Sequence, residues 1–491
     1  MSLIKIHGNN AQLFEDDHKL IKEIDNLLSF AVAGAEYTKA YQGWYNYKTK
    51  QFEKWDGIHR ILTSKGMFPT GLVDKLKEFY KNKGLDLEIE DLRDKPEKNI
   101  PLDISEKLKE LNLTPRDYQI SSLQATQTND RGILRLCTGA GKSLLAALIT
   151  ADKNTKTIIY VIGKDLLYQF YNLFVDIFGK ESVGIIGDGK CDIKKFNIAS
   201  VWSFGPAIGL TKNILIDSED EDEEKALSKT KYKDLLRLIK DTELHILDEC
   251  HMASCDTIQS IYKNCNAQWI YGLSGTPWRD DNSDLLIEGI LGRYIANVSA
   301  SDLIERDVLA KPFIRFVDVP AYPTKIPKNY QTIYKTYIVE NDDRNDLIVK
   351  NTLNGIKKGY QCLILFKRRA HGVILFDRLK KEIDCALLDG NNTSEERAEV
   401  KEAFLKKEIN CILASSIFDI GVNIPTISMM VLAGGGKSTS KALQRIGRCI
   451  RKAPGKTNAI VIDFHDNATF LKNHSLIRRK VYSSEKGFDV K

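Results

Sequence analysis

Residues 133 to 143 read ILRLCTGAGKS, an apolar run followed by a short loop with two glycines and a Lys-Ser pair. On its C-terminal side, further β-rich runs alternate with polar or amphipathic stretches. These runs are TIIYVI (157–162), FNIASV (196–201), LHILDE (244–249) and WIYGLS (269–274). Strands that alternate with helices predict a parallel sheet covered by helices on both faces. This part of the chain therefore predicts an α/β lobe.

The alternation restarts after Lys311 and Pro312. The later runs are FIRFVDV (313–319), CLILF (362–366), CALLDG (385–390), CILAS (411–415), ISMMVL (427–432) and AIVIDF (459–464). Two α/β lobes of similar size follow. The first hundred residues mix apolar and aromatic segments and end in the charged stretch Glu90 to Asn99, which we interpret as a linker. We expect a small α+β N-terminal domain (1–95), a first lobe (96–308), a second lobe (309–470) and a basic tail (471–491).

Composition is that of a soluble globular protein, with 491 residues, 43% hydrophobic and 28% charged. The net charge of +6 permits a nucleic-acid partner without requiring one. Nine scattered cysteines, no apolar run of transmembrane length and no secretory apolar region at the start favour reduced thiols, a cytoplasmic protein and no membrane partner. The group Cys250, His251, Cys255 and Cys265 lacks the spacing of a zinc site. The acidic run Asp217 to Glu224 favours a solvated loop over a metal site.

Two Gly-Lys-Ser sequences compete as phosphate-binding loops, TGAGKS (138–143) and AGGGKST (433–439). A phosphate loop needs backbone N–H groups at a helix N-terminus, a lysine, a Ser or Thr for magnesium, and an acid on a later strand. Neither sequence fits the strict G-x-x-x-x-G-K-[ST] pattern. Only the first is followed by a strand that ends in two acids, Asp248 and Glu249. The first loop is therefore the better candidate, and the second imitates it.

These residues now carry a resemblance to a known family. In order, the chain has Gln119 in PRDYQ, then TGAGKS, DECH (248–251), SGTP (274–277), SSIFDIGVNIP (415–425) and QRIGRCIR (444–451). This series resembles the superfamily two helicases of the DExH kind, over about residues 112 to 465. The resemblance implies two RecA-like domains in tandem, an ATP hydrolase with ATP and Mg²⁺ as cofactors, and nucleic acid as partner.

The resemblance also implies roles for individual residues. Gln119 would read adenine, Thr138, Gly139, Ala140, Gly141 and Lys142 would hold the phosphates, and Ser143 with Asp248 would position magnesium. Glu249 would activate water, and Ser274 with Thr276 would couple the nucleotide to the DNA groove. From the second lobe, Gln444, Arg448 and Arg451 would reach the γ-phosphate, and Asp419 with Gly421 would sense both ligands. An arginine finger accelerates phosphoryl transfer about a thousandfold or more.

The stretch KAYQGWYNYKTKQFEKWDGIHR (39–60) mixes basic and aromatic residues. Basic side chains bind the nucleic-acid backbone and aromatic side chains stack on bases or pack in a core. We select Lys48, Lys50, Lys54, Trp55 and Arg60 as DNA-binding candidates, and expect most of the aromatics to be buried in a small β-rich core. KWDGIHRIL with FPTGLVDKLKEFY is similar to the N-terminal domain of phage UvsW-type recombination helicases. That likeness implies branched DNA, including forks and four-way junctions, as substrate, and a phage-infected bacterial cell as location.

Basic residues also dominate the C-terminal end, with 13 Lys or Arg against 4 Asp or Glu from Thr426 to Lys491. Such a surface suits a duplex arm, and a merely charged terminus would look the same. Lys437 is a further candidate for DNA phosphate, with a solvated turn as the equal alternative. We interpret the chain as an ATP-dependent DNA helicase that remodels branched DNA. Alternatives are an RNA helicase, for which no RNA-binding module is recognisable, a restriction motor without a nuclease motif, and a nucleotide-gated scaffold, against which Glu249 and the two arginines argue.

Overall fold

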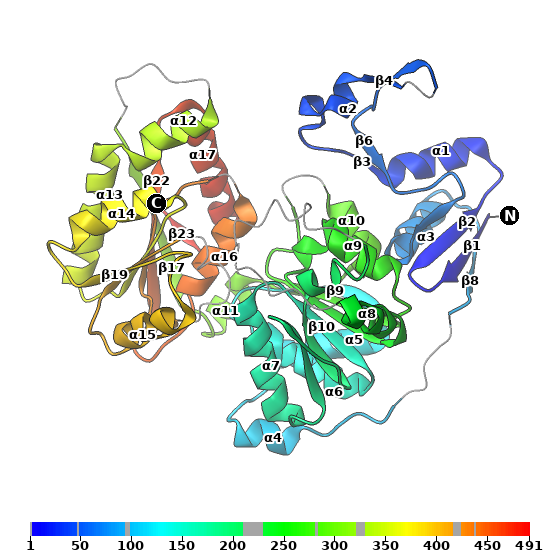
Figure 1. Cartoon of the computed structure of the whole chain (residues 1–491), viewed down its shortest axis with the longest axis horizontal. Coiled ribbons are helices and arrows are strands. Elements are labelled where there is room, and N and C mark those ends of the chain that lie inside the picture. Colours follow the sequence, from blue (N-terminus) through cyan, green and yellow to red (C-terminus); the bar gives the residue numbers. More distant parts are fainter. Residues whose placement is uncertain are drawn as a thin grey trace. The chain divides into compact units, whose positions relative to one another are not determined.

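The computed structural model describes residues 2–46, 49–93, 99–209, 229–279, 283–320, 329–415, 424–436 and 438–491. The chain divides into two compact units, and Val298 to Lys491 forms most of the second. Figure 1 labels the elements of both. Each unit is described by itself below.

The first unit contains an eight-stranded sheet in the order β12-β11-β13-β10-β14-β15-β9-β16. Its strands are β9 (Arg131–Leu136), β10 (Thr157–Val161), β11 (Val183–Gly187), β12 (Lys190–Asp192), β13 (Phe196–Ser200), β14 (Leu244–Asp248), β15 (Trp269–Ser274) and β16 (Tyr294–Val298). Every residue of β10, β11, β13 and β14 is buried, and β10, β14, β15 and β9 pair in parallel. Continuous apolar runs form such strands because both faces of the sheet are covered.

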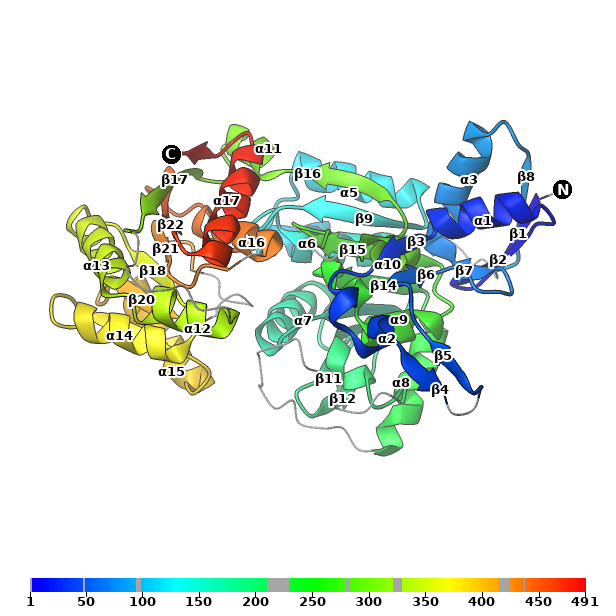
Figure 2. The ribbon, with the colours of Figure 1, turned by 90° about the horizontal axis from the view of Figure 1, so that it is seen from above.

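Helices on either side of this sheet are α4 (Ser105–Glu110), α5 (Asp117–Thr128), α6 (Lys142–Lys153), α7 (Lys164–Phe178), α8 (Lys229–Asp241), α9 (Asp256–Lys263) and α10 (Asp284–Leu291). Figure 2 shows α6 and α7 alongside the strands. The side chains between sheet and helices form one apolar cluster that includes Ile158, Leu247, Ile258 and Ile270. The predicted first α/β lobe is confirmed.

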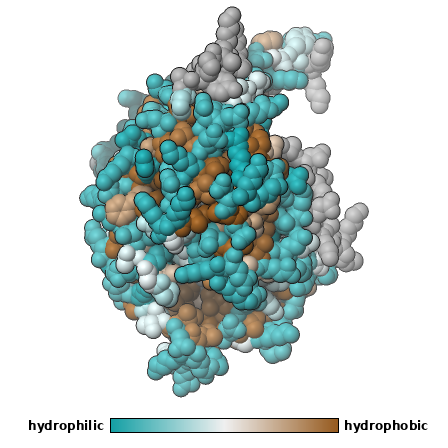
Figure 3. Space-filling view, turned by 90° about the vertical axis from the view of Figure 1, so that its left-hand side faces the viewer, coloured by the Kyte–Doolittle hydropathy of each residue, from teal (hydrophilic) through white to brown (hydrophobic). Residues whose placement is uncertain are grey.

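The second unit contains a seven-stranded sheet in the order β19-β20-β18-β21-β22-β17-β23, parallel at every described pair. The strands are β17 (Lys311–Asp318), β18 (Cys362–Leu365), β19 (Cys385–Leu388), β20 (Cys411–Ala414), β21 (Met429–Leu432), β22 (Asn458–His465) and β23 (Asp489–Val490). The helices are α11 (Ala300–Glu305), α12 (Tyr330–Tyr334), α13 (Asp342–Lys357), α14 (Arg369–Leu379), α15 (Ser394–Leu405), α16 (Thr439–Cys449) and α17 (Thr469–Ser484). Figure 3 shows apolar side chains exposed among hydrophilic ones on one face of the molecule. The predicted second α/β lobe is confirmed.

Residues 471–491 are not the separate basic tail that we expected. Helix α17 packs against β22 and β23, and β23 extends the sheet by pairing with β17 at Phe313 and Ile314. Arg478 is 3% exposed, because its guanidinium pairs with the buried carboxylate of Asp463. The net basic count could not show this, since a buried Arg–Asp pair and a solvated arginine look alike in composition.

The N-terminal residues form a small domain within the first unit. Its sheet, in the order β7-β2-β1-β8, is built from β1 (Ser2–His7), β2 (Asn10–Phe14), β7 (Met67–Pro69) and β8 (Leu87–Asp91). Helices α1 (His18–Leu27) and α3 (Val73–Asn82) contribute Leu20, Ile24 and Leu76 to its core. Asn9 joins this domain to the α/β lobe: its amide nitrogen donates to Cys265 O at 2.9 Å and its oxygen accepts from Arg131 at 2.8 Å. The described N-terminal residues are thus part of the first unit.

An arm leaves this small domain between β3 (Ser29–Ala31) and β6 (Ile58–Arg60), which pair in antiparallel fashion. It carries α2 (Lys39–Gln42) and the hairpin of β4 (Trp44–Asn46) and β5 (Gln51–Glu53). Figures 1 and 2 show α2 and β4 far from β1 and β2. The expectation that most aromatics here are buried is wrong. Exposed fractions are 43% for Trp44, 49% for Tyr45 and 66% for Phe52.

Among the helices that the structure describes, none combines the length and the apolar composition needed to cross a membrane.

Candidate active site

The first glycine-rich loop lies between β9 and α6. Gly139 and Gly141 have φ of +91° and +76°, in the left-handed region that favours glycine. Helix α6 then begins at Lys142, so its free N–H groups face the loop. Gln119 is 2% exposed and donates from Nε2 to Gly141 O at 3.1 Å. A Cβ on Gly141 would lie 2.5 Å from that nitrogen. Gln119 therefore holds the loop, and its contact with adenine stays a prediction.

Lys142 brings together the loop and the end of β14. Its ammonium lies 2.8 Å from Glu249 Oε1 and 3.4 Å from Asp248 Oδ1. The side chains are 14% exposed for Lys142, 3% for Asp248 and 25% for Glu249. Because β9 and β14 are parallel strands of one sheet, their carboxyl ends meet at the same edge, which is where the sequence placed these residues.

The charges in this group shift each other's pKa. Burial alone would lower the pKa of Lys142, but the two carboxylates outweigh it and the pKa is raised. Burial raises the pKa of Asp248, with Lys142 opposing. Burial would also raise the pKa of Glu249, but Lys142 and His251 outweigh it and that pKa is lowered. Glu249 is thus held as a carboxylate beside a cation, while Asp248 is the more readily protonated acid.

Glu249 has an unusual backbone. Its φ and ψ are 49° and 52°, a left-handed conformation that costs free energy in a residue other than glycine and is concentrated at functional sites. Its Oε2 accepts from Ser274 Oγ at 3.3 Å and lies 3.5 Å from His251 Nδ1. Thr276 N donates to Ser274 Oγ at 3.2 Å. The structure therefore brings the predicted coupling residues into contact with the predicted base.

The donor set fits a magnesium ion. Asp248 Oδ1 is buried, and no described donor has hydrogen-bonding geometry toward it. Ser143, the second residue of α6, follows Lys142 directly. A hydroxyl and a carboxylate oxygen are ligands that Mg²⁺ takes alongside waters and phosphates. Ser143 and Asp248 are the residues that would hold it.

Gln444 and Arg448 lie one turn apart on α16 of the second unit, and Arg451 follows the end of that helix. Burial, and then the like charge of Arg448, lower the pKa of Arg451 to about 10. Arg451 is therefore still a cation at neutral pH, and it lies close enough to Arg448 to feel its charge. The structure groups the three residues, as the sequence predicted, and their role toward nucleotide stays a prediction.

The second glycine run lies between β21 and α16 and has another environment. Its carbonyls accept from buried donors: Ala433 O from Arg344 at 2.8 Å, Gly434 O from Tyr334 at 2.6 Å and Gly436 O from Arg478 at 2.6 Å. Both nearby acids are occupied, since Arg344 pairs with Asp466 at 2.8 Å and Arg478 pairs with Asp463 at 2.8 Å. No carboxylate beside this run among the described residues is left for a metal, which supports the first loop as the phosphate site.

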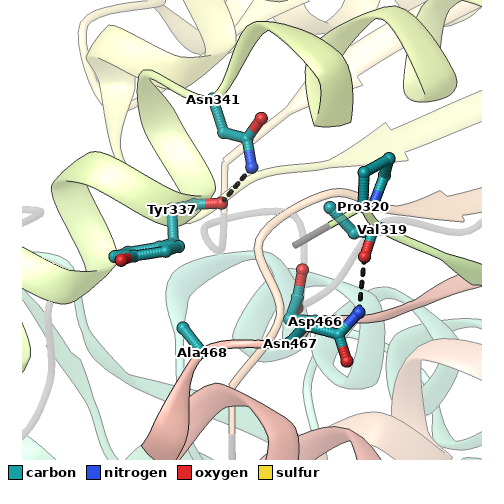
Figure 4. Close-up of a pocket in the computed structure, with 7 residues that line it drawn as sticks. All are labelled: Val319, Pro320, Tyr337, Asn341, Asp466, Asn467 and Ala468. Atoms are coloured by element: carbon teal, nitrogen blue, oxygen red, sulfur yellow. Dashed lines mark hydrogen bonds between the residues drawn. The ribbon is translucent and has the colours of Figure 1, made fainter. Parts of the chain in front are cut away.

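Figure 4 shows a pocket lined in part by Asp466, the acid that pairs with Arg344. Its lining residues are Val319, Pro320, Tyr337, Asn341, Asp466, Asn467 and Ala468. Two hydrogen bonds join residues of this lining: Asn467 donates to Val319 O, and Asn341 donates to Tyr337 O. Its free volume is about 10 Å³, which leaves room for about one water molecule and not for a small-molecule ligand. We assign it no ligand.

The DNA-binding candidates differ in their surroundings. Lys50 and Lys54 are exposed, and the Lys54 ammonium lies 4.9 Å from the centre of the Tyr41 ring. Trp55 is half-buried and donates from Nε1 to Ile58 O at 2.9 Å, and Arg60 pairs with Asp56 at 2.6 Å. Trp55 and Arg60 therefore brace the base of the arm.

Some predicted residues lie outside the described part of the chain. They are Lys48, Asp419, Gly421, Lys437 and the acidic run 217–224. In the described part, no group of three or more His, Cys, Asp or Glu side chains is arranged to hold a metal ion, and Cys250 and Cys265 are buried in the first unit. The sequence did not reveal that Arg344 and Arg478 are buried in ion pairs, because no local pattern marks their partners Asp466 and Asp463.

The chain is similar to several known proteins. Residues 112–279 match the family model described as type III restriction enzyme, res subunit, and residues 344–453 match helicase conserved C-terminal domain. The ATP-dependent DNA helicase uvsW of Enterobacteria phage T4 is 26% identical over 98% of both chains. The DNA 3'-5' translocase XPB2 of Sulfurisphaera tokodaii is 25% identical over 69% of this chain and 78% of that protein.

Among solved structures, S. cerevisiae Dbp5 bound to RNA and ADP BeF3 has a TM-score of 0.54. Its identity is 15%, over 79% of this chain and 92% of that chain, so the likeness concerns the fold alone. With the two family models, it confirms the expected pair of RecA-like domains in tandem.

Proposed function

This chain belongs to the superfamily two helicases, as its two family domains and its full-length relative establish, and from that premise we propose that it is an ATP-dependent DNA motor that remodels branched DNA. The single observation that carries the chemistry is the Lys142 ammonium between the carboxylates of Asp248 and Glu249, beside Ser274. The likeness of this chain to a phage DNA helicase, over 98% of both chains, supports DNA as the substrate and a phage-infected bacterial cell as the location.

Hydrolysis is assigned to the first unit. Lys142 and the N–H groups at the start of α6 bind phosphate, since both present positive charge to an anion. Glu249, whose lowered pKa keeps it an anion at neutral pH, orients the attacking water or accepts its proton. Ser143 and Asp248 would hold magnesium, which would neutralise charge on the phosphate oxygens.

The second unit is proposed to supply the cations of the transition state. Arg448, one turn from Gln444 on α16, and Arg451, just after the end of that helix, carry this role. Phosphoryl transfer depends mostly on the placement of charge, so arginines on a different domain from Lys142 make hydrolysis depend on the domains' arrangement. Asp419 and Gly421 are proposed to sense both ligands. We place the domain boundaries near residues 95 and 308.

Branched DNA is proposed to be engaged by the N-terminal arm, with Lys48, Lys50 and Lys54 on phosphate. Because Ala31 and Ile58 are register partners, the arm between them can be replaced by an Asn-Gly turn that closes the β3–β6 hairpin. The N-terminal core and its contacts through Asn9 then stay in place. Deletion of the whole domain would instead expose Leu285 and Leu286, which pack against that core.

The deciding experiment measures ATP hydrolysis with single-stranded DNA, blunt duplex, fork, four-way junction and RNA side by side, for the wild type and the arm-replaced chain. We expect fork or junction to stimulate the wild type most. The arm-replaced chain should keep its basal rate and lose that preference, and four-way-junction branch migration should fall with it. Greater stimulation by RNA than by any DNA would overturn the proposal, and so would an absence of nucleic-acid stimulation.

A further inference from the structure

Among its described residues, the arm buries a single apolar side chain, that of Ala35. The buried cluster of the N-terminal domain contains no side chain between Val32 and Gly57. The arm is held instead by backbone hydrogen bonds, such as Val32 N to Gly57 O at 2.9 Å and Trp55 N to Ala40 O at 2.9 Å. Exposed aromatic groups are costly to keep in water, so a cluster of them on such an arm marks a binding surface.

The β4–β5 hairpin displays two of these aromatics as a pair. Tyr45 and Phe52 are register partners, so their side chains leave the same face of the hairpin side by side. They are 49% and 66% exposed. The Phe52 ring lies over Gly43, where a Cβ would come within 2.4 Å of it. Glycine at this position leaves room for the edge of the ring, and most of the Phe52 side chain is exposed.

The charges around the pair are cationic. Glu53 points to the opposite face of the hairpin, where it accepts from Asn46 at 2.7 Å and from Thr49 at 2.9 Å. Lys50 and Lys54 are exposed, and neither has an ion-pair partner within the described part of the chain. Aromatic faces flanked by unpaired lysines complement a ligand that has flat apolar rings and an anionic backbone.

We propose that the β4–β5 hairpin is a stacking site for unpaired nucleobases, with Tyr45 and Phe52 as the platform and Lys50 and Lys54 on the adjacent phosphates. Single-stranded DNA satisfies these features, because each base offers a π-face that a duplex covers with the neighbouring base pair. This inference rests on the proposed function, since a branch point is where a motor on duplex DNA meets unpaired bases.

The test uses the full chain without nucleotide and measures fluorescence anisotropy with single-stranded DNA, a fork with single-stranded arms, and blunt duplex. In Tyr45→Ala/Phe52→Ala, we expect affinity for single strand and fork to fall about 10- to 100-fold, since stacking contributes about 1–3 kcal/mol per base. Affinity for duplex should change less than about twofold. Phe14→Ala is the matched control, because Phe14 is a 42% exposed aromatic of the same unit outside the arm.

Two further variant pairs separate stacking from other contacts. Tyr45→Phe/Phe52→Tyr keeps both rings and should bind as the wild type does, whereas Tyr45→Leu/Phe52→Leu keeps apolar bulk without π-faces and should not. Lys50→Ala/Lys54→Ala should reduce the slope of log affinity against log salt by about 1.4, at about 0.7 per phosphate contact on a single strand. The aromatic variants should leave that slope unchanged.

Wild-type affinity for single strand in Tyr45→Ala/Phe52→Ala, or an equal loss on blunt duplex, would overturn the inference. If DNA still stimulates ATP hydrolysis in that variant, the proposed motor function stands, and the exposed rings then fit a protein partner. If DNA fails to stimulate the wild type, the proposed function fails independently of the hairpin. A wild type that does not bind single strand would overturn the inference directly.

Discussion

Replacing Lys142 by methionine tests the charge arrangement of the site through stability, without any ligand. The substitution removes the ammonium and leaves Asp248 and Glu249 side by side, with side chains 3% and 25% exposed. Removing one partner of a buried ion pair costs about 3–5 kcal/mol. Because Glu249 is partly hydrated, we expect a loss near the lower end, about 3 kcal/mol at pH 8.

The loss should depend on pH in a definite direction. Burial already raises the pKa of Asp248, and without Lys142 it rises further. An acid whose pKa is higher in the folded state than in the unfolded state destabilises the fold as the pH rises. The variant should therefore regain stability as the pH is lowered from 8 to 5. In the wild type, the contribution from Lys142, whose pKa is raised, is lost only above about 10.5. The contribution from Glu249, whose pKa is lowered, is lost only below about 4.5.

Tryptophan fluorescence during urea unfolding isolates the relevant unit. All five tryptophans belong to the first unit: Trp44, Trp55, Trp202, Trp269 and Trp278. Lys77→Met is the control, since Lys77 and Asp74 form an ion pair with side chains 52% and 50% exposed, and it should cost less than about 1 kcal/mol. A Lys142→Met chain as stable as the wild type at pH 8, or a loss that is the same at pH 5, would refute the reasoning.

Three further outcomes are expected. Glu249→Gln should bind a fluorescent ATP analogue normally but turn over about 10²–10⁴-fold more slowly, and wild-type turnover would remove Glu249 from its role. Arg451→Ala should lower single-turnover hydrolysis about 10³-fold or more, while Lys452→Ala, next to it and paired with Asp307, should not. Arg478→Leu removes the ion-pair partner of the buried Asp463 and should lower the free energy of unfolding by about 3–5 kcal/mol, as measured by calorimetry. Arg479→Leu, at an exposed position, is the control, and an Arg478→Leu chain that unfolds at the same temperature as this control would contradict the pairing.

The sequence predicted strands that are buried along their whole length, and also β17 and β19, which are only partly buried. β10, β13 and β14 were predicted because a parallel strand needs apolar residues at successive positions. β11 was missed because VGIIG is short and has glycine at two of its five positions. β23 is a two-residue strand whose pairing with β17 is formed by distant sequence, and no local pattern marks it.

The grouping of the candidate site was predictable to the extent that topology determines it. Lys142, Asp248 and Ser274 lie at or beside the carboxyl ends of parallel strands, and such ends meet at one edge of a sheet. The hydrogen bond from Gln119 to the loop carbonyl Gly141 O was not predicted, because that contact depends on side-chain packing. The burial of aromatics in the arm was predicted wrongly, because composition does not distinguish a core from a surface that binds aromatic ligands.

The two glycine runs show which physical difference separates a phosphate loop from its imitation. Both follow a buried strand and precede a helix, and both have glycines with positive φ, such as Gly141 and Gly436. At the first, the Lys142 ammonium lies between the carboxylates of Asp248 and Glu249. At the second, Arg344 and Arg478 occupy the acids and bind the loop's carbonyls. Those arginines come from the distant helices α13 and α17, and they hold the carbonyls of Ala433 and Gly436 just before α16, the helix that carries Arg448.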